Sequence, residues 1–265
     1  GNTVVLKPAS LSPISSYHFV NALVEAGLPA GVLNMVTGPG GAVGAEIATN
    51  PRIKAVSFTG SNATGTGLYD TVTGRNAKCQ CEMGGKNPVI VLADADLDKA
   101  VAQVIAGAIL STGQKCTATS RVLVEQAVAD EFTDLLVEKV NAMEVGNGQR
   151  EGVQVGPAVD QQQLDNILSY IEVGKSEGAE VLAGGTRLTG GEDDKGFYVE
   201  PTVFGGMTRS MRIAQEEIFG PVVGVIPVAS FEEAMDIAND VEFGLSASII
   251  TRDLNRTFEY INGIQ

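Results

Sequence analysis

The sequence predicts an α/β fold in which two sub-domains are each built as three layers around a parallel, doubly wound sheet. Short β-branched runs alternate with segments of helical period along the whole chain, and this alternation favours parallel strands joined by helical crossovers. The 32 glycines among 265 residues fit the many tight turns of such a fold. No short-period repeat or low-complexity tract interrupts the pattern.

The first half of the chain alternates strands and helices in a βαβαβ rhythm. A strand is predicted over residues 3–7. Ser12 and Pro13 then supply an N-cap and a first-turn proline for a helix that Gly27 closes. The next elements are a strand over 33–38, a helix over 41–50, a strand over 55–60, a helix from 62 to about 70, and a strand over 77–85.

The second half repeats the rhythm with longer elements. Strands are predicted over 88–94, 120–126, 222–228 and 245–251, and helices over 96–110, 130–143 and 230–240. A further helix is indicated by apolar residues at i, i+3, i+4 and i+7, namely Leu164, Ile167, Leu168 and Ile171. The Gly- and Asp-rich stretch 184–196 is predicted to be an exposed loop. We place the boundary within "MGGKNP", giving sub-domains 1–84 and 85–265.

The composition argues against several classes of partner. The formal net charge of -14 disfavours nucleic acid and anionic membrane surfaces, because a polyanion would be repelled. No stretch is long and apolar enough to span a bilayer, and no signal peptide opens the chain. We therefore expect a cytoplasmic protein. The chain begins inside a strand pattern and ends without a helix stop, so we expect it to be a segment of a larger protein.

The three cysteines do not indicate a disulfide framework, because their number is odd and their spacing does not repeat. Cys79 and Cys81 alternate along a strand pattern, and we expect their side chains to face opposite ways, as a poor metal or disulfide pair. No cluster has metal-ligand spacing. His18 lies in the first helix pattern and is given no catalytic role.

Cys116 is the first candidate for chemistry. It follows a Gly-Gln-Lys turn between a long helix pattern and a strand pattern. Taken alone, a free cysteine more often packs as a small buried hydrophobe. Lys115 beside it would favour the thiolate, which is the nucleophilic form. The residues around Cys116 leave both interpretations open.

Further candidates stand where predicted strands end. Lys7 and Glu82 each close a strand pattern, and Gly60 and Ser61 lie between a strand and a helix. Open α/β sheets bind ligands at the carboxyl edge of their strands, and a helix start can hold phosphate. The alternatives are a surface lysine, a solvated carboxylate and an ordinary Gly-Ser helix cap. The turn does not match G-x-G-x-x-G.

The stretch "EEIFGPV" offers two carboxylates before a rigid apolar turn. Either Glu216 or Glu217 could reach a ribose hydroxyl, or both could face water. The sequence alone does not choose between them.

Taken together, the chain resembles the aldehyde dehydrogenase superfamily. The motifs "GNTVVLKPA", "EAGLPAGVLNMVTG", "FTGS", "EMGGKNP", "GQKC", "GFYVEPTVF", "EEIFGPV" and "FGLSASI" occur in the family's order and cover essentially all 265 residues. The resemblance implies a cofactor-binding Rossmann-like part before residue 85 and a thiol-bearing catalytic part after it. It also implies a small-molecule aldehyde as substrate and a homo-oligomer, a dimer or a tetramer, as the full-length protein.

The resemblance implies a role for the two reactive residues. Cys116 would attack the aldehyde as a thiolate, forming a thiohemiacetal and then, after hydride transfer to the cofactor, a thioacyl-enzyme. The Cys116 N–H would be one oxyanion donor, and Glu82 would activate the water that releases the acid. The family's second oxyanion donor, an asparagine, belongs to a part not found in this chain, so we expect the isolated segment to be poorly active.

The resemblance also implies which residues bind NAD or NADP. Lys7 would lie at the adenosine ribose, and Gly60 with Ser61 against the phosphates. Glu217 would hold the nicotinamide ribose, with Phe219 packing nearby.

One departure bears on the choice of cofactor. Ser10 stands where many NAD-dependent members carry a glutamate that binds the ribose hydroxyls. A carboxylate would repel a 2′-phosphate and serine would not, so we expect NADP to be accepted and favoured.

Two stretches resemble a narrower group within the family. "EMGGKNPVIVLADADLDKA" and "STGQKCTATSRV" look like the α-ketoglutaric semialdehyde (2,5-dioxovalerate) dehydrogenases. The alternatives are a succinate-semialdehyde or other aldehyde dehydrogenase, and a non-catalytic structural relative. Retention of both Cys116 and Glu82 argues against the last.

Overall fold

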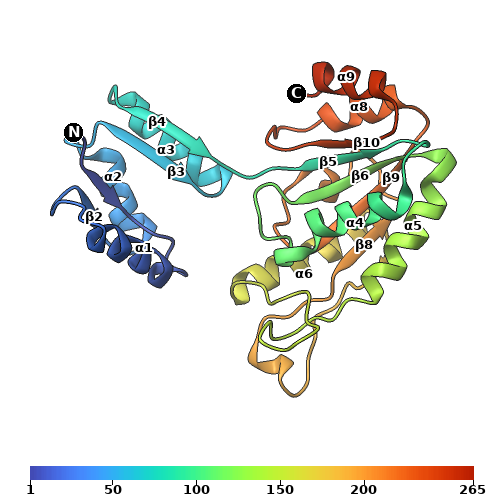
Figure 1. The fold of residues 1–265 in the computed structure, drawn as a ribbon, viewed down its shortest axis with the longest axis horizontal. Helices are drawn as coiled ribbons and strands as arrows, with labels where there is room; N and C mark the ends of the chain where they lie inside the picture. The colour runs from blue at the N-terminus through green and yellow to red at the C-terminus, as the bar shows by residue number, and fades with distance from the viewer. The chain divides into compact units, whose positions relative to one another are not determined.

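The computed structural model describes all 265 residues, and the chain divides into two compact units, Gly1–Met83 and Gly84–Gln265 (Figure 1). None of the helices combines the length and the apolar character needed to cross a bilayer.

The first unit contains two pairs of parallel strands. β1 (Val4–Leu6) pairs with β2 (Leu33–Met35), and β3 (Ala55–Thr59) pairs with β4 (Lys78–Glu82). The helical segments between them are α1 (Pro13–Glu25), η1 (Gly40–Gly44, of π type), α2 (Ala45–Thr49) and α3 (Asn62–Gly74). The two pairs form separate two-stranded sheets, where the rhythm of the sequence predicted one sheet. A small core of Ala48, Val56 and Val72 lies under α2 and α3.

The two ends of α1 test the helix start and stop signals that were read from the sequence. Pro13 opens the helix as predicted, but the Ser12 side chain makes no capping hydrogen bond. Gly27 follows the last turn with φ of 93°, a conformation that only glycine adopts without strain. Gly27 is therefore confirmed as the closing residue, and Ser12 holds the predicted N-cap position without a capping hydrogen bond.

The prediction that the side chains of Cys79 and Cys81 face opposite ways was wrong. Their Sγ atoms lie 3.7 Å apart, because residues two apart on a strand share one face and only successive residues alternate. Both thiols are free. Burial and the neighbouring Cys81 raise the pKa of the Cys79 thiol, so their closeness favours the protonated form.

The second unit is built on a six-stranded sheet with the order β10-β5-β6-β9-β8-β7 (Figure 1). Its strands are β5 (Asn87–Val91), β6 (Thr119–Glu125), β7 (Glu180–Ala183), β8 (Thr202–Gly205), β9 (Val222–Val228) and β10 (Ser248–Ile250). All neighbouring strands are parallel except β7 and β8, which are antiparallel at one edge. The prediction of an α/β fold with parallel sheets is confirmed, and this edge pair departs from it.

Helices cover both faces of this sheet, which gives the three predicted layers. α4 (Leu97–Ala108) and α5 (Gln126–Asn141) pack on one core, and α6 (Gln161–Ser176), α8 (Phe231–Asn239) and α9 (Leu254–Gly263) contribute to the other. The strands alternate between the two cores. In β5, Val89 and Val91 face the α4–α5 side, whereas Ile90 faces α6 and α8.

Three short segments of the second unit were not predicted from the sequence. They are β7, β8 and α7 (Arg212–Gln215), each of four residues. Periodicity cannot identify so short an element, because four residues span too few repeats of either the helical or the strand period. The predicted strand over 245–251 is shorter in the structure, and the loop over 184–196 contains one turn of 3-10 helix, η3 (Asp193–Lys195).

Candidate active site

The segment before Cys116 is a left-handed turn. After α4, the 3-10 segment η2 (Leu110–Gly113) contains Ser111, Thr112 and Gly113 with φ of 59°, 57° and 61°. Two consecutive non-glycine residues in this region are uncommon and costly, and they persist only where the surroundings hold them. The turn places Cys116, which is half-buried, between η2 and the start of β6.

Side chains in this turn bind the segment 156–159. The Thr112 hydroxyl donates to the Gly156 carbonyl at 3.0 Å, and the Gln114 amide donates to the Pro157 carbonyl at 3.3 Å. The Val159 N–H donates back to Gln114 Oε1 at 2.9 Å. These bonds offset the backbone strain and fix the chain on the N-terminal side of Cys116.

A buried asparagine fixes the chain on the other side of the thiol. The Asn87 amide, at the start of β5, donates to the carbonyls of Cys116 at 2.9 Å and Ala118 at 2.8 Å. The Ala118 N–H closes a turn onto the Lys115 carbonyl at 3.0 Å. Sequence reasoning missed Asn87, because its hydrogen-bond partners lie on segments distant in the sequence and no local pattern marks them.

The two carboxylates of "EEIFGPV" have different surroundings. Glu216 accepts two bonds from the Arg212 guanidinium, both at 2.8 Å, and one from the Tyr170 hydroxyl at 2.8 Å. Arg212 lowers the pKa of Glu216. Glu217 is half-buried, accepts one N–H from Gly85 at 3.2 Å, and has its pKa raised by burial. Arg212 and Tyr170 thus bind Glu216 and leave Glu217 outside their hydrogen bonds, and the ribose contact of Glu217 stays a prediction.

Phe219 occupies the turn after Glu217. Its backbone has φ of 57°, and its ring is exposed. Two side chains of α6 hold the turn: Gln163 donates to the carbonyls of Ile218 and Phe219 at 3.1 and 2.9 Å, and Asn166 donates to that of Ile218 at 3.2 Å. The ring is thus presented from a fixed backbone.

The cysteine turn and the "EEIFGPV" turn pack directly together. A Cβ on Gly113 would lie 2.0 Å from the Gly220 carbonyl oxygen, so no other residue fits there. A small hollow of about 20 Å³ lies between the two turns and is lined by residues that include Lys115, Glu217 and Phe219. The fold therefore brings Glu217 and Phe219 to the loop that carries Cys116.

Two buried cations lie beneath this region. The Arg121 guanidinium is fully buried and donates to the main-chain carbonyls of Lys86, Ile237 and Ala238 at 2.9 to 3.1 Å. The Lys86 ammonium is buried without a hydrogen-bond partner. Burial and the Arg121 charge lower the pKa of Lys86 to about 7, against the opposing effect of Glu217.

In the first unit, the predicted residues meet at the carboxyl edge of β3 and β4. Thr59 is paired with Glu82, and the Gly60 N–H donates to the Glu82 carbonyl at 3.1 Å. Ser61 caps α3, accepting the Thr64 N–H at 3.4 Å. The Glu82 side chain is exposed. The parallel register thus places Gly60, Ser61 and Glu82 side by side.

Lys7 and Ser10 follow β1 in the same unit. The Lys7 ammonium donates to the Pro8 carbonyl at 3.1 Å, and Ser10 is exposed. The β1–β2 pair shares no hydrogen bonds with the β3–β4 pair. Cys116, Glu217 and Phe219 belong to the second unit. Glu82, Lys7, Ser10, Gly60 and Ser61 belong to the first.

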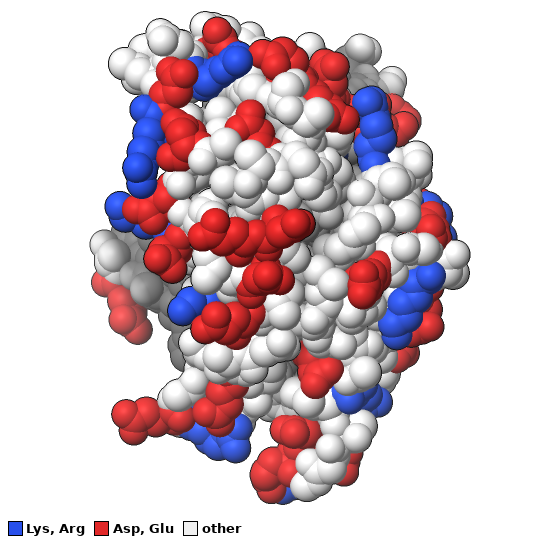
Figure 2. Space-filling view, turned by 90° about the vertical axis from the view of Figure 1, so that its right-hand side faces the viewer, with Lys and Arg blue, Asp and Glu red and all other residues white.

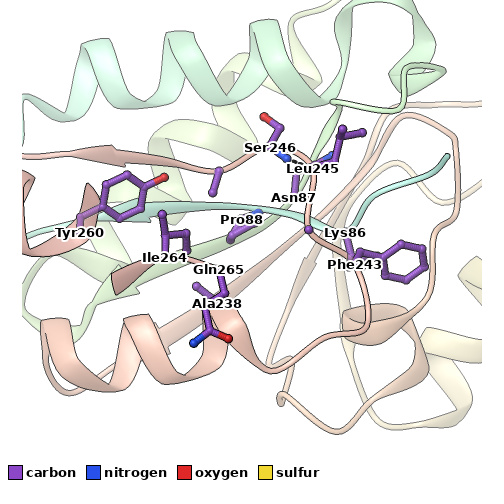
Figure 3. Close-up of a pocket in the computed structure, with 12 residues that line it drawn as sticks. Lys86, Asn87, Pro88, Ala238, Phe243, Leu245, Ser246, Tyr260, Ile264 and Gln265 are labelled. Atoms are coloured by element: carbon purple, nitrogen blue, oxygen red, sulfur yellow. Dashed lines mark hydrogen bonds between the residues drawn. The ribbon is translucent and has the colours of Figure 1, made fainter. Parts of the chain in front are cut away.

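A larger cavity of about 250 Å³ is lined in part by Asn87 (Figure 3). It is lined by the start of β5, residues 243–247 and the end of α9. Figure 3 shows the bond from the Ser246 N–H to Asn87 Oδ1, 3.1 Å long. None of the predicted site residues lines this cavity.

The surface charge agrees with the composition. Figure 2 shows one face of the molecule on which acidic side chains gather and basic ones are scattered singly. That face carries no continuous basic patch of the kind that binds a phosphate backbone. No group of three or more His, Cys, Asp or Glu residues is arranged to hold a metal ion.

Comparison with known proteins places the whole chain in one family. The model of the aldehyde dehydrogenase family matches residues 1–265. Over the full chain, it is 51% identical to alpha-ketoglutaric semialdehyde dehydrogenase from Bacillus subtilis (strain 168) and 45% identical to alpha-ketoglutarate semialdehyde dehydrogenase from Haloferax volcanii. It spans 54% and 55% of those proteins, about half of their length.

The structural comparison agrees. Betaine aldehyde dehydrogenase from Staphylococcus aureus, solved in complex with NAD+, matches with a TM-score of 0.96 and 34% identity. The match covers 99% of this chain and 52% of that one. From the sequence match along its full length and from this shared fold, the chain belongs to the aldehyde dehydrogenase family.

Proposed function

We propose that the chain is the thiol-bearing part of an NAD(P)-dependent dehydrogenase that oxidises a semialdehyde to the carboxylate. The observation that carries the proposal is the packing of the Cys116 turn against the turn of Glu217 and Phe219. This packing brings the candidate nucleophile and the candidate cofactor contacts into one rigid region. The likeness to two α-ketoglutaric semialdehyde dehydrogenases supports the substrate class.

The residues of each unit fit a nicotinamide cofactor. Glu217 keeps a half-buried carboxylate that accepts the Gly85 N–H and lies beside Gly84, where a Cβ would lie 2.0 Å from Oε2. In the first unit, α3 has 13 residues, and the N-terminus of such a helix suits a phosphate. Bound NAD(P)+ supplies the hydride acceptor that the oxidation needs. The betaine aldehyde dehydrogenase that shares the fold was solved with NAD+.

The protein's own groups would do the remaining chemistry. The Cys116 thiolate attacks the aldehyde carbon, and the backbone N–H of Cys116 donates to the developing oxyanion. Loss of hydride from the thiohemiacetal leaves a thioester on Sγ. Glu82 takes a proton from water, the hydroxide adds to the thioester carbon, and the thiolate leaves with the acid as product.

Substitutions in the full-length protein test these roles. C116S should abolish aldehyde oxidation, and C81S, a cysteine of the first unit, should keep it. E82Q should show a burst of one reduced cofactor per site followed by slow turnover, because acylation proceeds and hydrolysis does not. E25Q, an exposed glutamate of the first unit, is the matched control. Wild-type turnover in C116S would refute the proposal.

The choice of cofactor and substrate is tested separately. We propose that NADP is accepted and favoured, because Ser10 leaves room for a 2′-phosphate and brings no charge against it. S10E should lower kcat/KM for NADP far more than for NAD. A strong NAD preference in the wild type would contradict this part. Comparing kcat/KM for α-ketoglutaric and succinic semialdehyde identifies the substrate, and a homo-oligomer remains a prediction for sedimentation analysis.

A further inference from the structure

We propose that Asn87 is a positioning residue for the Cys116 thiol, acting through the main chain that follows the nucleophile. The inference rests on the proposed role of Cys116 and adds a residue to which neither the motifs nor the comparisons give a role. It places the control of nucleophile geometry on β5, a strand buried on both faces.

The Asn87 side chain makes three of the four hydrogen bonds that an amide can form. It is 3% exposed, its two amide hydrogens are directed at the Cys116 and Ala118 carbonyls, and its oxygen accepts the Ser246 N–H (Figure 3). A buried amide whose two hydrogens and oxygen are all bonded is held in a single orientation, because rotation would break these bonds and leave buried polar groups unpaired. It therefore serves as a rigid reference point for the loop.

The neighbouring residue Gly85 shows how closely Asn87 and the Cys116 main chain are packed. A Cβ on Gly85 would lie 2.6 Å from Asn87 Oδ1 and 2.8 Å from the Cys116 carbonyl oxygen. The amide and the nucleophile's own carbonyl are thus packed against one glycine Cα. A glycine at 85 admits this close approach.

The two carbonyls held by Asn87 lie two residues apart and bracket Thr117. Fixing both sets the direction in which the chain leaves Cys116, while the bonds of Thr112 and Gln114 set the direction in which it arrives. Nucleophilic attack is sensitive to such alignment, and a displacement of about 1 Å can cost about 10²-fold in rate. Asn87 thus acts on the thiol without touching substrate.

The test uses the full-length protein with Asn87→Asp, which keeps the shape and removes both amide donors. Asn239→Asp is the matched control, because Asn239 also donates to one carbonyl, of Gly263, and accepts one N–H, of Gln265, both at 2.9 Å. Asn87→Ala provides a second variant without a new charge. The readout is the pre-steady-state burst of reduced cofactor with a semialdehyde.

The burst separates positioning from folding. Its amplitude counts competent sites, whereas its rate constant reports how well each site reacts. Both Asn87 variants should lower the rate constant by about 10- to 100-fold, with the cofactor KM within about twofold and Asn239→Asp unchanged. A lower amplitude with a wild-type rate constant would show that Asn87 only stabilises the fold, and would overturn the inference.

Alkylation of Cys116 by iodoacetamide, located by peptide mass, gives a readout that does not depend on aldehyde oxidation. It should be slower in Asn87→Asp than in Asn239→Asp. If C116S keeps wild-type turnover, the proposed function fails and the inference falls with it. If C116S is inactive while the Asn87 variants match the wild type in burst and alkylation rates, the inference alone fails.

Discussion

Replacing Gly113 by alanine tests how tightly the cysteine turn is packed. Gly113 has φ of 61°, and a Cβ there would lie 2.0 Å from the Gly220 carbonyl oxygen and 2.8 Å from that of Ala108. Gly206, in the same unit, has almost the same φ of 62°, and no atom lies within 4 Å of the position that its Cβ would take. The two glycines therefore differ in available space and hardly in backbone conformation.

The magnitudes follow from that difference. A left-handed alanine costs about 1–2 kcal/mol, offset by about 0.4–1 kcal/mol from the stiffer unfolded chain. G206A should therefore lower the free energy of unfolding by about 1 kcal/mol. G113A adds an overpacking cost of about 1–3 kcal/mol, because two backbone carbonyls must move.

Urea unfolding of both variants in the full-length protein, followed by circular dichroism, measures the two values. The transition midpoints are compared at equal slope, because a changed slope would report a different unfolded state. The reasoning is refuted if G113A and G206A differ by less than about 0.5 kcal/mol, which is the usual range for surface changes.

Three further predictions concern charges and caps in the second unit. K86M should remove a pH dependence: the folded-state pKa of Lys86 is about 7, below that of a solvated lysine, so the unfolded chain binds more protons above pH 7. Between pH 7 and 9, the unfolding free energy of the wild type should then rise relative to that of K86M, by up to about 1.4 kcal/mol per pH unit. Urea titrations in which the difference between wild type and K86M falls with pH would contradict this. R121M leaves three buried carbonyls without their donor and should lower the free energy of unfolding by about 1–3 kcal/mol for each carbonyl that stays unpaired, whereas exposed R252M should change it little. Equal midpoints of the two variants in denaturant would refute this. D160A removes the N-cap of α6, where the Asp160 carboxylate accepts the Gln163 N–H at 2.8 Å. The Tm measured by calorimetry should fall by an amount equivalent to about 1 kcal/mol. An unchanged Tm would contradict this prediction.

The sequence predicted elements best where one local signal was strong. Asp96 and Leu97 opened α4 as expected because a carboxylate cap and a long apolar period agree there. Pro13 and Gly27 marked the ends of α1 through restrictions on φ that act within one residue. The pairing of β7 with β8 depends on contacts across the chain, and no local period encodes it.

The sequence named candidate residues for the site, and their geometry could not be predicted from it. The choice between Glu216 and Glu217 is made by Arg212 and Tyr170, and only the first, four residues before Glu216, was visible in the sequence. The left-handed Ser111 and Thr112 could not be foreseen, because distant carbonyls hold them against their own preference. Asn87 was missed for the same reason, since its partners lie on other segments.

The place of β10 in the sheet has a consequence during synthesis. Asn87 at the start of β5 bonds to Ser246 just before β10, 159 residues further along. At about 5–20 residues per second, the ribosome needs roughly 8 to 30 s to deliver that partner. Throughout this interval one edge of β5, whose five residues are all buried in the folded unit, presents unpaired main-chain groups. The nascent chain therefore carries an open strand edge that is exposed to mispairing until β10 has been made.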